Sequence, residues 1–220
     1  MTGLLLKDWY LLKNQGRYFI TIVILGLAML FVGSGSYTFF VTSYLTFLFG
    51  IFGLSTISYD EFDNGMSYLM TLPVSRKTYV QEKFVFSFLL IISSWAVTVL
   101  VCGLWIGPKD LGDDLLLWGI GEAVYLVLVL IFVSVNLPLS MKFGPEKGKI
   151  IMFAGVGGIA LSFVILARIP GVDLDTLVES VKRAVEVHAV PLLISALMTC
   201  LLFMAVCYHI SVRIMEHREF

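Results

Sequence analysis

The side chains best suited to bind a metal or to act as nucleophiles are few, and their spacing keeps them apart. The three histidines are His188, His209 and His217. None has a second ligand three or four residues away, as a helical metal site requires. The three cysteines lie inside apolar runs without a C-x-x-C pattern and are Cys102, Cys200 and Cys207. We therefore expect neither a metal site nor a disulfide framework, and we interpret the cysteines as small packing residues.

Two further motifs that could support catalysis are incomplete. Residues 144–150, GPEKGKI, resemble a phosphate-binding loop, but the loop is one residue short and Ile150 stands where Ser or Thr would bind magnesium. Ser55 follows Gly53 in an apolar run, as in an intramembrane serine protease, yet the first five apolar runs contain no histidine to act as its base. We therefore expect no nucleotide site and no catalytic site in this chain.

Glu122 is the one acidic residue well inside an apolar run. It lies about 10 Å along a helix that starts at Leu115. An acid at this depth is either functional within the membrane or close enough to the outer face to reach water. A proton-driven carrier would need several such residues, and only Glu122 and His209 are available.

The composition is that of a membrane protein. The chain has 220 residues, of which 59% are hydrophobic and 14% charged, and its mean hydropathy is +0.94, whereas soluble domains carry about 25% charged residues. The net charge of −1 gives no basic surplus to bind nucleic acid, so we exclude DNA and RNA as partners.

Six apolar runs are long enough to cross a bilayer as helices. We predict an all-α membrane protein with one transmembrane domain and spans at 18–35, 37–59, 84–106, 115–136, 150–166 and 191–214. Eleven of the 15 basic residues fall in the segments on one side, which the positive-inside rule makes cytoplasmic. Both termini would therefore be cytoplasmic.

Two of the connecting segments outside the spans predict amphipathic helices. In residues 1–17, Leu5, Trp9 and Leu12 share one face opposite Lys7 and Asn14, which predicts an interfacial helix. This helix either anchors the first span or takes part in mechanics. In residues 168–189, apolar side chains including Leu174, Leu177 and Val181 lie opposite charged ones, and Asp173 can cap the helix. That helix lies in the outer headgroup plane or closes a path between spans.

Residues 60–83 carry a third, different segment. Gly65 permits a turn, Pro73 ends a short helix, and Ser75 can cap the next one. The short helix is apolar around nearly all of its circumference, through Met66, Tyr68, Leu69, Met70 and Leu72. An exposed apolar patch of this kind indicates a protein-binding surface, although the helix could also lie on the membrane or fold back on the chain.

In the fifth span, Gly155, Gly157 and Gly158 predict close helix contact.

The order of these parts resembles the permease subunit of type-2 ABC exporters over essentially the whole chain. The resemblance is carried by Glu61-x-x-x-Gly65 with Leu69, and by Leu72-Pro73-Val74-Ser75-Arg76 with Tyr79 and Lys83. With no further soluble domain, the chain is most similar to the small permeases of the phenol-soluble modulin (Pmt) type.

The resemblance implies a dimer of this chain, or a pair with a close paralogue, in the plasma membrane of a bacterium. Residues 66–72 would be the coupling helix that docks on a separate ABC ATPase, with Glu61 and Arg76 as flanking polar contacts. ATP and magnesium would be bound by that ATPase. The helix from Asp173 to His188 would form part of an extracellular gate.

The expected function is ATP-driven export of hydrophobic or amphipathic molecules, such as phenol-soluble modulins or antimicrobial peptides, because the spans are almost purely apolar. The alternatives are an immunity or sensing subunit against antimicrobial peptides, a secondary carrier, and an intramembrane enzyme.

Overall fold

The computed structural model describes residues 1–32, 37–62, 65–106, 115–144, 147–148, 150–151, 154–155, 157 and 174–218. At 32, 106, 115–117, 174–190 and 192–193 it describes the backbone alone. Every regular element within these residues is helical. The helices are α1 (Thr2–Asn14), α2 (Gly16–Val32), α3 (Thr38–Glu61), α4 (Gly65–Thr71), α5 (Arg76–Ile106), α6 (Leu115–Phe143) and α8 (Leu174–His217).

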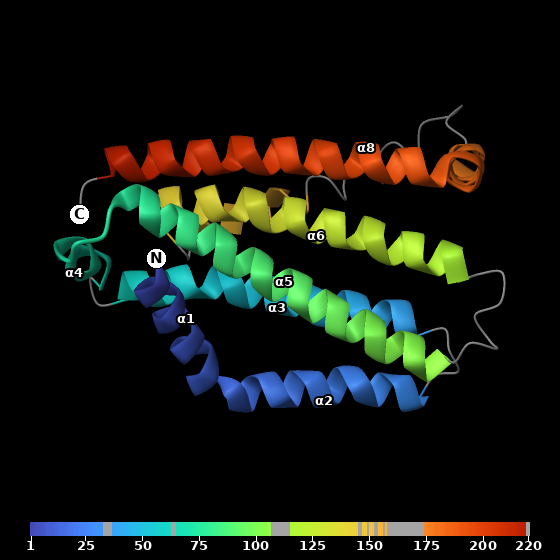
Figure 1. Cartoon of the computed structure of the whole chain (residues 1–220), viewed down its shortest axis with the longest axis horizontal. Helices are drawn as coiled ribbons and strands as arrows, with labels where there is room; N and C mark the ends of the chain where they lie inside the picture. Colours follow the sequence, from blue (N-terminus) through green and yellow to red (C-terminus); the bar gives the residue numbers. More distant parts are fainter. Residues whose placement is uncertain are drawn as a thin grey trace.

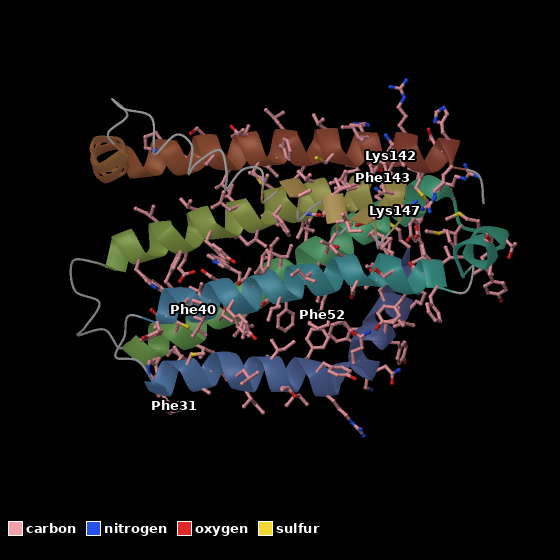
Figure 2. All side chains as sticks on the ribbon, turned by 180° about the vertical axis from the view of Figure 1, so that it is seen from behind. Phe31, Phe40, Phe52, Lys142, Phe143 and Lys147 are labelled. Carbon is pink, nitrogen blue, oxygen red and sulfur yellow. The ribbon has the colours of Figure 1, made fainter. Side chains whose placement is uncertain are left out.

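The long helices run side by side around α3, which packs against α2, α5 and α6 (Figure 1). Helix α8 lies along α6 on one side of the bundle, whereas α2 lies on the opposite side. The short helix α4 is at one end of the bundle, and both chain termini lie toward that end. Lys142 and Lys147 also lie toward the α4 end, while Phe31 and Phe40 lie at the other (Figure 2).

Among the described residues, four helices are long and apolar enough to cross a membrane, and the bent pair α1 and α2 makes up to a fifth span. The two helices of this pair meet at 65°. The predicted span at 150–166 lies largely outside the described residues, so the six-span topology and its orientation remain predictions. The 31 residues of α5 extend over about 45 Å, more than the roughly 30 Å of a bilayer core, so part of this helix projects beyond the apolar layer.

Two helix boundaries differ from the predicted spans because proline does not end the helix. Helix α6 continues through Pro138 to Phe143, beyond the predicted end at 136. Helix α8 joins the predicted outer helix to the last span through Pro191. Its first part is seen end-on in Figure 1, whereas the rest follows the long axis of the bundle, so α8 is bent. Neighbouring helices can satisfy the backbone groups that proline frees.

Glycines bring α3 close to its neighbours. A Cβ atom on Gly53 would lie 2.8 Å from the Ser87 hydroxyl of α5, and one on Gly26 of α2 would lie 3.0 Å from Leu45. These contacts show small residues at tight helix interfaces. The predicted packing glycines are different ones: a Cβ on Gly155 or Gly157 meets no atom within 4 Å in the described part, and Gly158 lies outside it.

Candidate functional site

Helix α4 is positioned by local features that the sequence predicts. Gly65 is required at its start, because a Cβ there would lie 2.9 Å from the Asp60 carbonyl oxygen. The helix ends at Thr71, two residues before Pro73. The Ser75 hydroxyl accepts a hydrogen bond of 3.1 Å from the Thr78 amide and so caps α5, which confirms the predicted cap. A short, sharply bounded helix therefore connects the two central helices α3 and α5.

The two faces of α4 have different surroundings. Met66 and Leu69 are only 4% and 7% exposed and belong to the main hydrophobic core, whereas Tyr68 is 71% and Leu72 is 44% exposed. The prediction that the whole circumference is available to a partner is therefore wrong for Met66 and Leu69, because the helix folds one side onto α3 and the core. Met70 is half-buried against the same core. We call the exposed residues Tyr68, Leu72 and Pro73 the docking face.

The predicted flanking contacts of α4, Glu61 and Arg76, are engaged within the chain. The Arg76 guanidinium donates hydrogen bonds to the carbonyl oxygens of Met215 (3.0 Å) and Glu216 (2.6 Å) at the end of α8. Arg218 donates to Glu61 Oε1 (2.6 Å) and to the Met141 carbonyl oxygen (2.8 Å). Arginine suits both roles, because it satisfies free carbonyls at a helix C-terminus and binds carboxylates through charge-assisted hydrogen bonds.

We call Glu61, Arg76 and Arg218 the C-terminal clamp, and the stretch between Glu61 and Arg76, which contains α4, the α4 segment. The clamp holds the two ends of this segment to the ends of α6 and α8. Glu61 lies immediately before the segment and Arg76 immediately after it. The residues on both sides of α4 are therefore in direct contact with the end of the last helix of the bundle.

A group of buried charges, which the sequence analysis missed, joins α1, α3 and α5. The fully buried Lys83 ammonium lies 2.5 Å from Asp8 Oδ2 and 2.7 Å from Asp60 Oδ2. Asp60 also pairs with Lys7 of α1 and accepts a hydrogen bond of 3.1 Å from the Tyr79 hydroxyl. Three helices that are distant in sequence thus share one set of charges.

Glu82 completes this group. Its carboxyl is buried 3.8 Å from Lys83 Nζ, and neither oxygen has a hydrogen-bond partner in the described part of the chain. A buried carboxyl in such surroundings favours its protonated form, which leaves Asp8 and Asp60 to balance Lys7 and Lys83. We call Lys7, Asp8, Asp60, Glu82 and Lys83 the ion network.

The ion network adjoins the docking face. A cavity of about 230 Å³ lies between them, and its walls include Lys7 and Asp60 on one side and Tyr68 and Leu72 on the other. The docking face therefore lies next to the buried charges that join α1 to α3 and α5.

The sequence contained a signal for this network. Lys83 and Asp60 stand at the ends of apolar runs, and a charge in that place usually has a charged partner. Lys83 was expected as a cytoplasmic basic residue and as part of the resemblance to type-2 ABC permeases, without a charged partner. The apolar face of α1 was predicted at Leu5, Trp9 and Leu12, whereas the side chains of this helix that the chain itself buries are Leu4 and Asp8.

Glu122 is buried between α3, α5 and α6, so the interpretation that it reaches outer-face water is wrong. Neither carboxyl oxygen meets a hydrogen-bond partner among the described atoms. The adjacent Thr42 hydroxyl interacts with this carboxyl but donates its hydrogen to the Thr38 carbonyl oxygen at 3.1 Å. The Trp95 indole donates to the Glu122 backbone carbonyl oxygen at 3.1 Å and fixes this turn of α6 against α5.

The other predicted gate residues, Leu174, Leu177 and Val181, have helical backbone in α8, but their side chains lie outside the described part. Within the described residues, no cluster of three or more His, Cys, Asp or Glu side chains could hold a metal ion.

Comparison with known proteins identifies a family. The model of the family described as "ABC-2 family transporter protein" matches residues 3–216. No curated protein and no solved structure matches the chain. The family match covers nearly the entire sequence, including α1, the α4 segment and α8. The chain therefore belongs to the ABC-2 family of membrane transport proteins.

Proposed function

We propose that this chain is the permease subunit of an ATP-driven exporter and that its docking face binds a separate ABC ATPase. Family membership supports the general class, since ABC-2 permeases normally work with ABC ATPase partners. The observation that carries the docking assignment is the exposure of Tyr68, on a helix whose opposite side is fixed in the core, and of Leu72 directly after that helix. Exposed apolar side chains at the end of a membrane bundle favour a protein partner.

The contacts around α4 support a mechanical role. Met66 and Leu69 connect the helix to the core, and the C-terminal clamp connects its flanks to α6 and α8. When ATP closes the ATPase dimer, its movement pushes α4, and the attached helices follow. ATP binding shifts the permease between states by the difference in binding free energy that the ATPase has for them.

The proposed substrates are hydrophobic or amphipathic molecules, with amphipathic peptides such as phenol-soluble modulins as one example. The spans offer few polar groups for a sugar or another strongly hydrated substrate. Two copies of this chain, or this chain and a paralogue, would enclose the path in the plasma membrane. The predicted gate in the first part of α8 would close it on the outer side.

The docking assignment is tested by co-expression with candidate ABC ATPases from the same genome, beginning with the neighbouring gene. The double variant Tyr68→Asp with Leu72→Asp places two charges on the docking face, where both side chains are exposed. We expect the variant to insert and purify normally but to lose the ATPase during affinity purification. Asn14→Asp, a charge added at the exposed end of α1, is the matched control and should keep it.

The assignment fails if the double variant retains the ATPase as well as the control does. Transport of a labelled amphipathic peptide into inverted vesicles, dependent on ATP and on the ATPase, then tests export. Binding of the ATPase without any such transport would favour the immunity or sensing subunit.

A further inference from the structure

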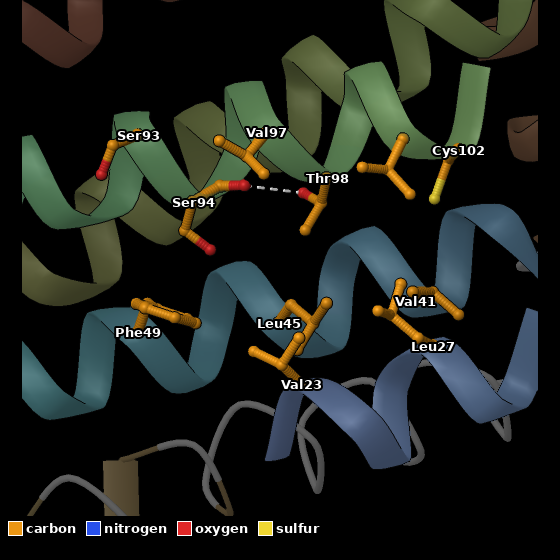
Figure 3. Close-up of a pocket in the computed structure, with 11 residues that line it drawn as sticks. Val23, Leu27, Val41, Leu45, Phe49, Ser93, Ser94, Val97, Thr98 and Cys102 are labelled. Atoms are coloured by element: carbon orange, nitrogen blue, oxygen red, sulfur yellow. Dashed lines mark hydrogen bonds between the residues drawn. The ribbon is translucent and has the colours of Figure 1, made fainter. Parts of the chain in front are cut away.

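A crevice of about 250 Å³ opens in the membrane-spanning part between α2, α3 and α5 (Figure 3). Val97 on its wall is 59% exposed, whereas Ser94, one turn earlier on α5, is only 8% exposed. The crevice therefore leads from the lipid-facing surface of α5 toward the interior of the bundle.

The inner part of the crevice carries polar groups. The Ser94 hydroxyl has no hydrogen-bond partner among the described residues. Cys102, at the far end of the α5 wall, has its Sγ 3.6 Å from the Thr42 hydroxyl. Thr42 in turn interacts with the carboxyl of Glu122. Two small side chains, Cys102 and Thr42, thus separate the crevice from the buried acid.

Glu122 lacks a positive partner in this structure. None of the ion pairs within the described part includes it, and both of its oxygens are without hydrogen-bond partners there. A carboxylate buried among apolar helices is costly unless it takes up a proton or a cation accompanies it. The indole of Trp95 on α5 contacts the backbone carbonyl of the same residue, and aromatic rings also attract cations.

We propose that the crevice and Glu122 together bind a lipophilic cation, a molecule with one apolar chain and one positively charged amine. The chain occupies the apolar crevice from the lipid side, and the amine reaches the Glu122 carboxylate when the Thr42 and Cys102 side chains turn aside. Charge complementarity selects this occupant over a neutral acyl chain of the bilayer. The inference rests on the proposed transport function and narrows its substrates to cationic amphiphiles.

The test measures equilibrium binding of tritiated dodecylamine, which is protonated to a primary ammonium at neutral pH, to the full chain in nanodiscs of zwitterionic lipid, with empty nanodiscs as the blank. Tritiated dodecanol, which has the same chain without the charge, is the neutral comparison. Glu122→Gln removes the charge with little change in shape. Glu216→Gln, an exposed acid at the other end of the bundle, is its control. Val97→Trp narrows the crevice mouth at an exposed position.

We expect saturable binding of the cation to the wild type and to Glu216→Gln. Binding to Glu122→Gln should be about tenfold weaker or more, since hydrogen bonds to charged groups have this magnitude. Val97→Trp should weaken it as well. The proposal is overturned if Glu122→Gln binds the cation as tightly as the wild type, or if the wild type binds dodecanol as tightly as the cation, which would indicate an acyl-chain pocket. If Glu122→Gln does not fold, the difference in affinity of the wild type for the cation and for dodecanol decides.

Neither ATP nor an ATPase is present in this assay. Loss of cation selectivity would therefore leave the docking result unaffected, and a negative docking result would leave the cation site standing.

Discussion

Replacement of Lys83 by methionine removes the charge at the centre of the ion network. Methionine keeps most of the length of the side chain but removes the ammonium that lies between Asp8 and Asp60. The ion network would then hold three buried or nearly buried acids and only Lys7. Removing one partner of a buried ion pair costs about 3–5 kcal/mol, because the other charge remains buried.

This cost converts into a measurable change in melting temperature. For a protein of this length, 1 kcal/mol corresponds to about 2–4 °C, so Lys83→Met should lower the apparent Tm by about 6–20 °C. The assay is thermal unfolding of the purified protein in detergent, followed by the loss of its monodisperse peak in size-exclusion chromatography. Lys77→Met is the matched control, since Lys77 is an exposed lysine on the same helix, and it should shift the Tm by at most about 2 °C.

A second step tests the charge balance itself. Glu82→Gln removes the acid that has no hydrogen-bond partner in the described part, so it should recover part of the Tm lost in Lys83→Met. Asp60→Asn in the same background should also recover part of the loss, with a coupling of about 1–3 kcal/mol. A Tm of Lys83→Met within 2 °C of the Lys77→Met control would refute the reasoning that the network is a buried, interdependent set.

Three further outcomes follow from the packing. Gly53→Ala should lower the Tm by the equivalent of about 1–3 kcal/mol, because the added Cβ meets Ser87. Gly119→Ala, the control with open space around it, should change the Tm little. Equal melting curves for the two variants would contradict the tight contact. Leu69→Asp should prevent stable folding, because Leu69 is buried, whereas the exposed Leu72→Asp should purify in normal yield; chromatography of both variants decides. Arg218→Gln should lower the free energy of unfolding by at most about 1 kcal/mol, since the pair with Glu61 is partly exposed. The variant should, however, weaken the stimulation of the partner ATPase by substrate. Unchanged stimulation would argue against the C-terminal clamp as a transmission path.

Local features of the fold could be predicted from the sequence because they depend on neighbouring residues. The start of α3, the end of α4 near Pro73 and the Ser75 cap all rest on contacts within about four residues. The continuation of α6 through Pro138 could not be predicted in this way. Whether a proline ends a helix within a bundle depends on neighbours that the local pattern does not contain.

The site was predictable only in part for the same reason. The pattern located the apolar helix at 66–72, but it could not tell which side of that helix the core would cover, since this depends on the packing of α3. The pairing of Asp8 with Lys83 spans 75 residues, and no local pattern specifies such a partner. Glu61 and Arg76 were predicted as flanking contacts for a partner protein, and their hydrogen bonds to residues at the end of α8 could not be foreseen from the local pattern.

The contact between Gly53 and Ser87 restricts how the molecule can rearrange. The two helix backbones are so close there that one cannot slide past the other without first moving apart, and the buried salt bridge between Asp60 and Lys83 ties the same pair of helices together nearer the α4 end. We therefore expect α3 and α5 to move together as one rigid body and the hinges of any conformational switch to lie outside this pair.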